Sequence, residues 1–209
     1  MFDHFGCLAP YYEKFIQPKD PQEIREFGQL PTSGALLDAG GGTGRIAQAL
    51  RSQAGMIVVA DLSLRMLEQA QSKDELKLVC SHSERLPFPD ASFERVIMVD
   101  ALHHVIDQRQ TAAELWRVLK PGGRLVIEEP DSRVWSVKLI ALFEKLALMR
   151  SHFLSPPQIA ALFPHRQAEV SIETRGYNAW VIVKRLNSFL FFKSREYKVQ
   201  RCRNPNPNL

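Results

Sequence analysis

A glycine-rich turn follows a short apolar run in the segment LLDAGGGTGRIA at residues 36–47. Gly40, Gly42 and Gly44 lack the Cβ atoms that would block a ligand, and they permit the positive φ angles that a tight strand-to-helix turn can need. The helical pattern that follows would aim its unpaired N–H groups and positive dipole end at the same ligand. The turn therefore predicts a ligand site, with adenosyl cofactors as the first candidates.

Two cofactor patterns fit this turn. From Asp38 it reads D-x-G-x-G-x-G, which suits S-adenosylmethionine, and from Gly42 it reads G-x-G-x-x-A, which suits a dinucleotide. Asp61 ends the apolar run MIVVA about twenty residues further on, where a carboxylate can accept hydrogen bonds from both hydroxyls of a ribose. Leu62 and Met66 come next and could pack on an adenine ring or serve only as core. These residues indicate an adenosyl cofactor and leave its identity open.

Alternating strands and helices must position these residues. Apolar runs predict strands at residues 35–38, 56–60, 76–80, 95–99 and 124–128, and helical patterns occupy residues 21–29, 45–52, 64–72, 112–119, 134–150 and 155–163. This alternation implies right-handed crossovers and a parallel sheet with helices on both faces. Residues 168–174 and 179–183 predict an antiparallel hairpin at the end of the sheet. We expect an α/β, Rossmann-like three-layer sandwich with a seven-stranded, mostly parallel sheet that binds ligands at the carboxyl ends of its strands.

Length and composition agree with one domain that has a substantial core, since 45% of the 209 residues are hydrophobic. No apolar run is long enough to span a membrane, and MFDHFG at the N-terminus does not resemble a secretion signal. We expect a cytoplasmic protein. Cys7, Cys80 and Cys202 lie far apart, so neither a disulfide framework nor a cysteine metal site is indicated, and no metal is expected.

The net charge of +4 comes from the end of the chain. Residues 187–209 contain five basic residues and one acid, which leaves 22 of the 27 basic and 22 of the 23 acidic residues in the body. Because the body is neutral, the basic composition is no evidence for a nucleic-acid-binding face, and no nucleic-acid partner is expected.

Taken together, the chain resembles a class I S-adenosylmethionine-dependent methyltransferase of the small-molecule group that includes the ubiquinone and menaquinone biosynthesis methyltransferases. The resemblance covers roughly residues 11–185 and rests on five blocks in order: LLDAGGGTGRIA, VVADLSLRMLEQA, SERLPFPDASFERVIMVDALHHV, AELWRVLKPGGRLVIEEP and the closing WVIVKR. LPFPDASFERV and LKPGGRLVI are not expected of nicotinamide dehydrogenases. The resemblance therefore favours S-adenosylmethionine at the glycine turn.

The resemblance also implies which residues would contact S-adenosylmethionine. In chain order, they are Tyr12 in an N-terminal lid, Asp38, Gly40, Gly42 and Gly44 at the methionine part, Asp61 at the ribose, Leu62 and Met66 at the adenine, Ser83 and Glu84 in the loop flanking the adenine, and Asp100 and Ala101 near the methionine end.

His82 departs from the pattern of the family. Relatives usually carry an acid there, which accepts a hydrogen bond from the adenine amino group. A neutral imidazole nitrogen could accept that bond and a protonated one could not. We expect cofactor binding to be weaker, or more sensitive to acid, than is usual in the family.

The expected organisation is an N-terminal helical lid segment at residues 1–30, a methyltransferase domain at 31–186 and a basic C-terminal extension at 187–209. Residues 1–30 could equally form a helix that only packs on the sheet. The predicted reaction is methyl transfer from S-adenosylmethionine to a small, apolar or aromatic acceptor by in-line displacement.

A base is needed only if the acceptor loses a proton. His103 and His104 are candidates by position after the fourth strand, although one could pack inside the fold and the other cap a loop. Two alternative functions are a catalytically silent S-adenosylmethionine-binding module and a nicotinamide-dependent oxidoreductase.

Overall fold

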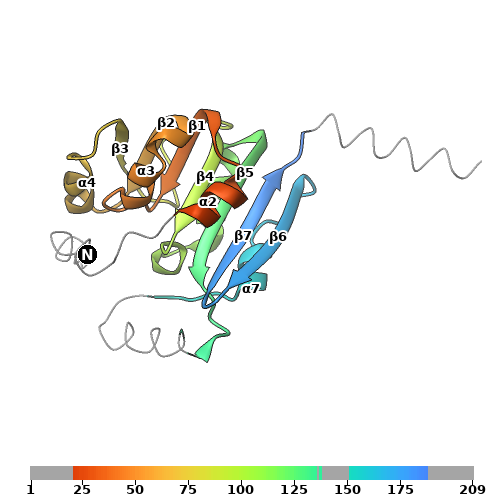
Figure 1. Cartoon of the computed structure of the whole chain (residues 1–209). Coiled ribbons are helices and arrows are strands. Elements are labelled where there is room, and N and C mark those ends of the chain that lie inside the picture. The colour runs from red at the N-terminus through yellow and green to blue at the C-terminus, as the bar shows by residue number, and fades with distance from the viewer. Residues whose placement is uncertain (1–20, 136, 138–150, 188–209) are drawn as a thin grey trace, which may run out of the picture.

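The computed structural model describes residues 21–135, 137 and 151–187. They form a seven-stranded sheet in the order β3-β2-β1-β4-β5-β7-β6 (Figure 1). The strands are β1 (Thr32–Ala39), β2 (Ala54–Asp61), β3 (Leu76–Cys80), β4 (Phe93–Val99), β5 (Leu119–Pro130), β6 (Ala168–Arg175) and β7 (Asn178–Arg185). β7 runs antiparallel to both β5 and β6, and the other pairs are parallel. The predicted mixed α/β sheet is confirmed.

Helices cover both faces of the sheet and complete the expected three layers. They are α2 (Gln22–Gly28), α3 (Arg45–Ala49), α4 (Leu64–Ala70), α5 (Gln108–Val118) and α7 (Pro156–Ala160), with short 3-10 turns η1 (Arg51–Gln53) and η2 (Leu102–His104). Residues of α2, α3 and α4 pack into one core cluster, and residues of α5 and α7 pack into another. Figure 1 shows α2 lying across β4 and β5.

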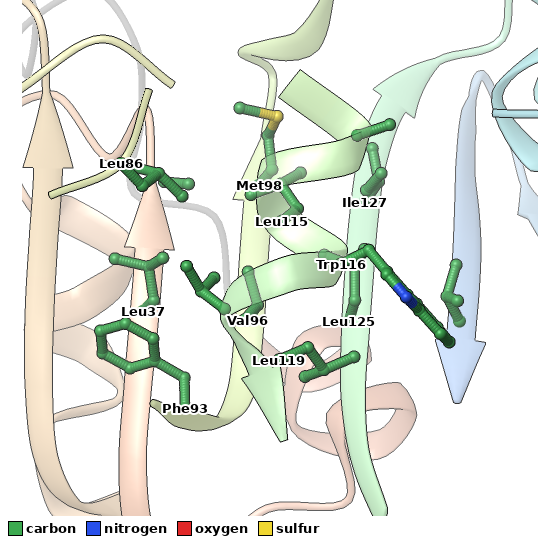
Figure 2. Packing of buried hydrophobic residues seen from close by; sticks show 14 of the residues in the cluster. Leu37, Leu86, Phe93, Val96, Met98, Leu115, Trp116, Leu119, Leu125 and Ile127 are labelled. Atoms are coloured by element: carbon green, nitrogen blue, oxygen red, sulfur yellow. The ribbon is translucent and has the colours of Figure 1, made fainter. Parts of the chain in front are cut away.

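Neighbouring strand residues point to opposite faces, so the two cores share the same strands. Leu36 belongs to the cluster under α2 and α3, whereas Leu37 belongs to the cluster under α5. In Figure 2, Leu115 of α5 lies over the β-strand residues Val96 and Leu125. All three side chains are fully buried, and burying each such side chain contributes about 1.5–3 kcal/mol.

Two elements begin four or more residues before their predicted starts. α5 begins at Gln108 rather than at residue 112, because the Asp107 carboxylate caps it by accepting a 2.9 Å hydrogen bond from the Gln110 N–H. β5 begins at Leu119 rather than at residue 124. Its pairing with β4 shifts between Leu119 and Arg124, so the KPGG segment forms an irregularity inside the strand. Gly122 has a φ of +82° there.

Two arginines hold the end of α2 against the sheet. Arg95 of β4 donates a 2.6 Å hydrogen bond to the Gly28 carbonyl, and Arg124 of β5 donates a 3.1 Å bond to the Phe27 carbonyl. Arg175, at the end of the edge strand β6, donates to both carboxylate oxygens of Glu26. All of these contacts are made by the last three residues of α2, so its C-terminal end is fixed to the sheet.

Some predicted segments lie outside the described residues. These are Tyr12 with most of the expected N-terminal lid, nearly all of the helix predicted at 134–150, and the C-terminal extension beyond residue 187. The helix predicted at 155–163 is present but shorter, ending at Ala160. Within the residues described, none of the helices is long and apolar enough to cross a membrane.

Candidate functional site

The glycine turn connects β1 to α3 at the carboxyl edge of the sheet. Gly40, Gly42 and Gly44 have φ angles of +70°, +55° and +72°, which few other residue types adopt. The Gly40 N–H donates a 2.7 Å hydrogen bond to the Ala60 carbonyl, which fastens the turn to β2. A Cβ atom on Gly40 would lie 2.7 Å from the Cβ of Ala101, whereas one on Gly42 would meet no described atom closer than 4.0 Å. The turn is therefore packed at Gly40 and open at Gly42.

Asp61, at the end of β2, reaches this turn. Its Oδ2 accepts a 2.8 Å hydrogen bond from the Gly42 N–H, and its Oδ1 accepts a 2.8 Å bond from the Ser63 N–H. The carboxylate is half-buried beside the open part of the turn. Two residues that are 19 positions apart in the sequence thus form one polar surface.

Asp38 lies at the end of β1 beneath the turn and is almost completely buried. Burial raises the pKa of its carboxyl from 3.8 to about 7; the charge of Arg45 opposes the shift, and the charge of Asp61 adds to it. Among the described residues, none makes a hydrogen bond to its buried Oδ2. Because a buried oxygen without a partner is costly, Asp38 is suited to receive a donor or a cation from a ligand.

The loop after β4 closes the site on its other side. Asp100 has a φ of +52°, which is rare outside glycine, and its carboxylate lies 3.5 Å from the Arg45 guanidinium. Its N–H donates to the Glu128 carbonyl at 2.9 Å. Since Ala101 contacts Gly40 and Arg45 begins α3, the structure brings together the turn, α3 and the loop after β4.

The predicted adenine-side residues are spread between surface and core. The side chain of Leu62 is 51% exposed, whereas Met66 is buried at 3%. His82 is exposed and its Nδ1 lies 3.8 Å from Glu84 Oε2. Glu84 Oε1 also accepts hydrogen bonds from the backbone N–H groups of residues 106 and 107, at 2.9 and 3.3 Å. Glu84 therefore connects its loop to the segment after η2. Ser83, between His82 and Glu84 in the sequence, is half-buried.

His103 and His104 differ in their surroundings. His103 is buried, its Nδ1 is hydrogen-bonded to Glu129 Oε2, and its ring stacks on Phe153 with centroids 4.2 Å apart. His104 is only partly buried, and its Nδ1 lies 3.3 Å from Ser151 Oγ. Burial, together with the charge of His103, lowers the pKa of His104 from 6.5 to about 3. The His104 imidazole is therefore neutral at physiological pH and is a weak base.

Two buried glutamates lie at the end of β5, and neither was assigned a role from the sequence. Glu128 accepts hydrogen bonds from the Asn178 amide at 3.0 Å and from the Trp180 indole at 3.1 Å. Glu129 faces the other side of the sheet and bonds to the loop after β4. Two successive acids that end the apolar run RLVI are a signal that could have marked them, because a buried acid requires partners.

The motif LPFPD is held in place from α5. Arg117 donates to the Leu86 carbonyl at 3.0 Å and to the Phe88 carbonyl at 2.7 Å. Glu114 accepts a 2.8 Å hydrogen bond from the Leu86 N–H and a pair of bonds from Arg117. This motif therefore shapes the loop that precedes β4. Its role in the fold is structural.

No cluster of three or more potential metal-binding side chains occurs in the described part of the chain. Cys80 is exposed as a free thiol.

Comparison with known proteins identifies the type of domain. Residues 37–127 match a family described as a methyltransferase domain. The chain is 36% identical to the ubiquinone/menaquinone biosynthesis C-methyltransferase of Hahella chejuensis over 105 residues, which are 46% of this chain and 42% of the relative. It is 41% identical to the demethylmenaquinone methyltransferase of Deinococcus radiodurans over 139 residues, which are 60% of this chain and 58% of the relative. The chain spans about half the length of these curated relatives.

Solved structures share the fold. An S-adenosylmethionine-dependent methyltransferase of Thermotoga maritima superposes with a TM-score of 0.74 at 22% identity, covering 88% of this chain and all of that one. Another from Aquifex aeolicus gives a TM-score of 0.65 at 17% identity, covering 89% of this chain and all of that one. The resemblance predicted from the sequence is thus confirmed: residues 37–127 match a methyltransferase domain, and the seven-stranded fold is that of solved S-adenosylmethionine-dependent methyltransferases.

Proposed function

We propose that this chain binds S-adenosylmethionine at the carboxyl edge of β1, β2 and β4 and transfers its methyl group to a small, apolar or aromatic acceptor. One observation carries the proposal: Asp61 and the buried Asp38 flank a glycine turn that is packed at Gly40 and open at Gly42. The methyltransferase domain match over residues 37–127 supports the same cofactor.

The residues present fit this cofactor. Asp61 would accept hydrogen bonds from the ribose hydroxyls, in a site whose Gly42 N–H already orients its carboxylate. Asp38 would face the positively charged methionine end, because its Oδ2 has no hydrogen-bond partner among the described residues. Ala101, which contacts Gly40, would border that end. Leu62, exposed after β2, would pack on the adenine, with His82 near the adenine amino group.

S-adenosylmethionine, when bound, supplies a methyl group that its sulfonium charge already activates. The protein's part is then to hold the acceptor in line with that group and to exclude water. His103 and His104 are the proposed bases if the methylated compound must lose a proton. His104, with its lowered pKa, is too weak a base to take that proton before the methyl group is transferred. We therefore favour an acceptor that is nucleophilic with little help from a base.

Exposed apolar side chains at the carboxyl edge support an apolar acceptor. Ile106 after η2, Trp135 after β5 and Tyr177 between β6 and β7 are 68%, 72% and 55% exposed. Single exposed apolar residues are common, but Ile106 and Trp135 follow β4 and β5, which end next to the proposed cofactor site, and Tyr177 follows β6 at the same edge of the sheet. Because two curated relatives are named for methylation of ubiquinone or menaquinone precursors, we propose quinols as the first acceptors to test.

Calorimetric titration of the whole chain with S-adenosylmethionine, S-adenosylhomocysteine and NAD tests the cofactor. We expect binding of the first two, and binding of NAD alone would overturn the proposal. Methyl transfer is then assayed with radiolabelled cofactor on reduced demethylmenaquinone, catechols and aromatic amines. Tight cofactor binding without transfer to any of them would favour a catalytically silent module.

A further inference from the structure

Glu129 is a buried carboxylate to which the proposed function assigns no role. Its Oε1 accepts hydrogen bonds from the N–H groups of Ala101 at 3.0 Å and Leu102 at 2.7 Å, and its Oε2 bonds to His103 Nδ1. Only 3% of the residue is exposed. One side chain of β5 therefore receives hydrogen bonds from three consecutive residues of the loop after β4.

The same loop holds the segment that precedes α7. The His103 carbonyl accepts a 2.7 Å hydrogen bond from the His152 N–H, and the His103 ring stacks on Phe153 at an interplanar angle of 16°. Gln108 joins both segments, because its amide donates to the Leu102 carbonyl at 3.0 Å and to the His152 carbonyl at 2.6 Å. A continuous set of contacts thus runs from Glu129 through His103 to residues 152 and 153.

We propose that Glu129 is a positioning residue for methyl transfer, which acts by setting the loop of residues 101–103 and, through His103, the acceptor side of the site at Phe153. This inference rests on the proposed function, because it places residues 101–103 beside the methyl donor. Ala101 contacts the glycine turn, and Phe153 stacks on the His103 ring. Glu129 therefore fixes the spacing between the donor side and the acceptor side.

Glu129 also determines which nitrogen of His103 carries a proton. A carboxylate that carries no proton only accepts hydrogen bonds, and the proposal therefore assigns the donor role in this contact to Nδ1 of His103. Any proton that the ring gains or loses is then on Nε2. A glutamine at this position would turn its amide N–H₂ toward Nδ1 while its oxygen still accepts from residues 101 and 102. Nδ1 would become the acceptor, and the proton would move to Nε2.

Glu128 provides a matched control. It is the adjacent residue and is similarly buried, but it accepts its hydrogen bonds from Asn178 and Trp180, which lie on the opposite face of the sheet. Replacing either acid by glutamine removes one buried charge from the end of β5. Only Glu129→Gln removes a charge that bonds to the loop after β4.

The test combines NMR, calorimetry and kinetics on the full chain. The ¹⁵N shifts of His103 should show a proton on Nδ1 in the wild type and in Glu128→Gln, and on Nε2 in Glu129→Gln. S-adenosylmethionine affinity should remain unchanged in Glu129→Gln, while kcat with reduced demethylmenaquinone, or with whichever compound of the panel is methylated, falls about 10- to 100-fold. An unchanged Nδ1 proton in Glu129→Gln, or equal effects of both variants, would overturn the inference.

A second variant covers the case in which Glu129→Gln does not fold. Phe153→Leu leaves the hydrogen bonds of Glu129 in place and removes the ring that His103 positions. It should raise the KM for the acceptor and leave the affinity for S-adenosylmethionine unchanged; an unchanged KM would contradict the inference. The proposed function fails if the wild type binds no S-adenosylmethionine. That outcome is distinguishable from failure of this inference, because the NMR result does not require the cofactor.

Discussion

The carboxylate of Asp61 accepts a hydrogen bond from the N–H of Gly42, so the last residue of β2 is joined directly to the open part of the turn after β1. The bond orients one carboxylate oxygen toward the turn, and Ser63 orients the other. A ribose would therefore meet an acceptor whose position is already fixed, which lowers the entropic cost of binding.

Replacing Asp61 by alanine should weaken binding of S-adenosylmethionine about 10- to 100-fold, since hydrogen bonds to a charged group contribute about 1.5–3 kcal/mol. Calorimetric titration measures this loss. Glu68→Ala, which removes an exposed acid from α4, is the control and should leave the affinity unchanged. Unchanged binding in Asp61→Ala would show that the ribose lies elsewhere.

The raised pKa of Asp38 predicts how the stability of the ligand-free protein depends on pH. The folded protein retains a proton up to about pH 7 that the unfolded chain releases near pH 3.8. The free energy of unfolding therefore falls as pH rises through this window, by about 4 kcal/mol from this group. Asp38→Asn should remove that fall and be more stable than the wild type above pH 7, as measured by urea unfolding.

The same substitution should weaken cofactor binding, because a neutral amide attracts the positively charged methionine end less strongly. Stability and binding would then change in opposite directions at pH 8. A variant that lost both stability and affinity would indicate that Asp38 is needed for the fold alone.

His104→Ala should lower the rate of methyl transfer less than about tenfold, because a base with a pKa of about 3 contributes little proton transfer near neutral pH. Its removal should also leave the pH profile of kcat between pH 6 and 8 unchanged. A loss of two orders of magnitude in rate, together with the loss of an acidic limb, would instead identify His104 as the base.

The sheet was predictable because its central strands contain apolar runs and β6 alternates apolar with polar residues, and the glycine turn with Asp61 followed from spacing alone. Pairwise contacts were not predictable. Nothing local in the sequence indicates that Glu129 bonds to residues 101–103 or that Arg117 holds the LPFPD motif, since both depend on neighbouring strands and helices. The start of β5 was also missed, because KPGG suggests a helix stop and a turn rather than an irregularity within a strand.

Arg117 should be the main stabiliser of the loop before β4. Its guanidinium donates to two carbonyls of the LPFPD motif and to both oxygens of Glu114. The bonds to Glu114 and Asp90 raise its pKa further above its usual value. Arg117→Ala should cost about 2–3 kcal/mol of stability, since it leaves the partly buried carbonyls and Glu114 without a donor. Thermal unfolding measures this loss.

Arg117→Lys should recover little of that loss, because an ammonium group cannot reproduce the planar set of donors that reaches carbonyls and a carboxylate together. Arg109→Ala is the control, since Arg109 is an exposed residue of the same helix. Lysine keeps the positive charge of Arg117 and loses the geometry of its donors. If lysine restored full stability, the loop would be held by the positive charge, and the hydrogen bonds to the carbonyls of Leu86 and Phe88 would be dispensable.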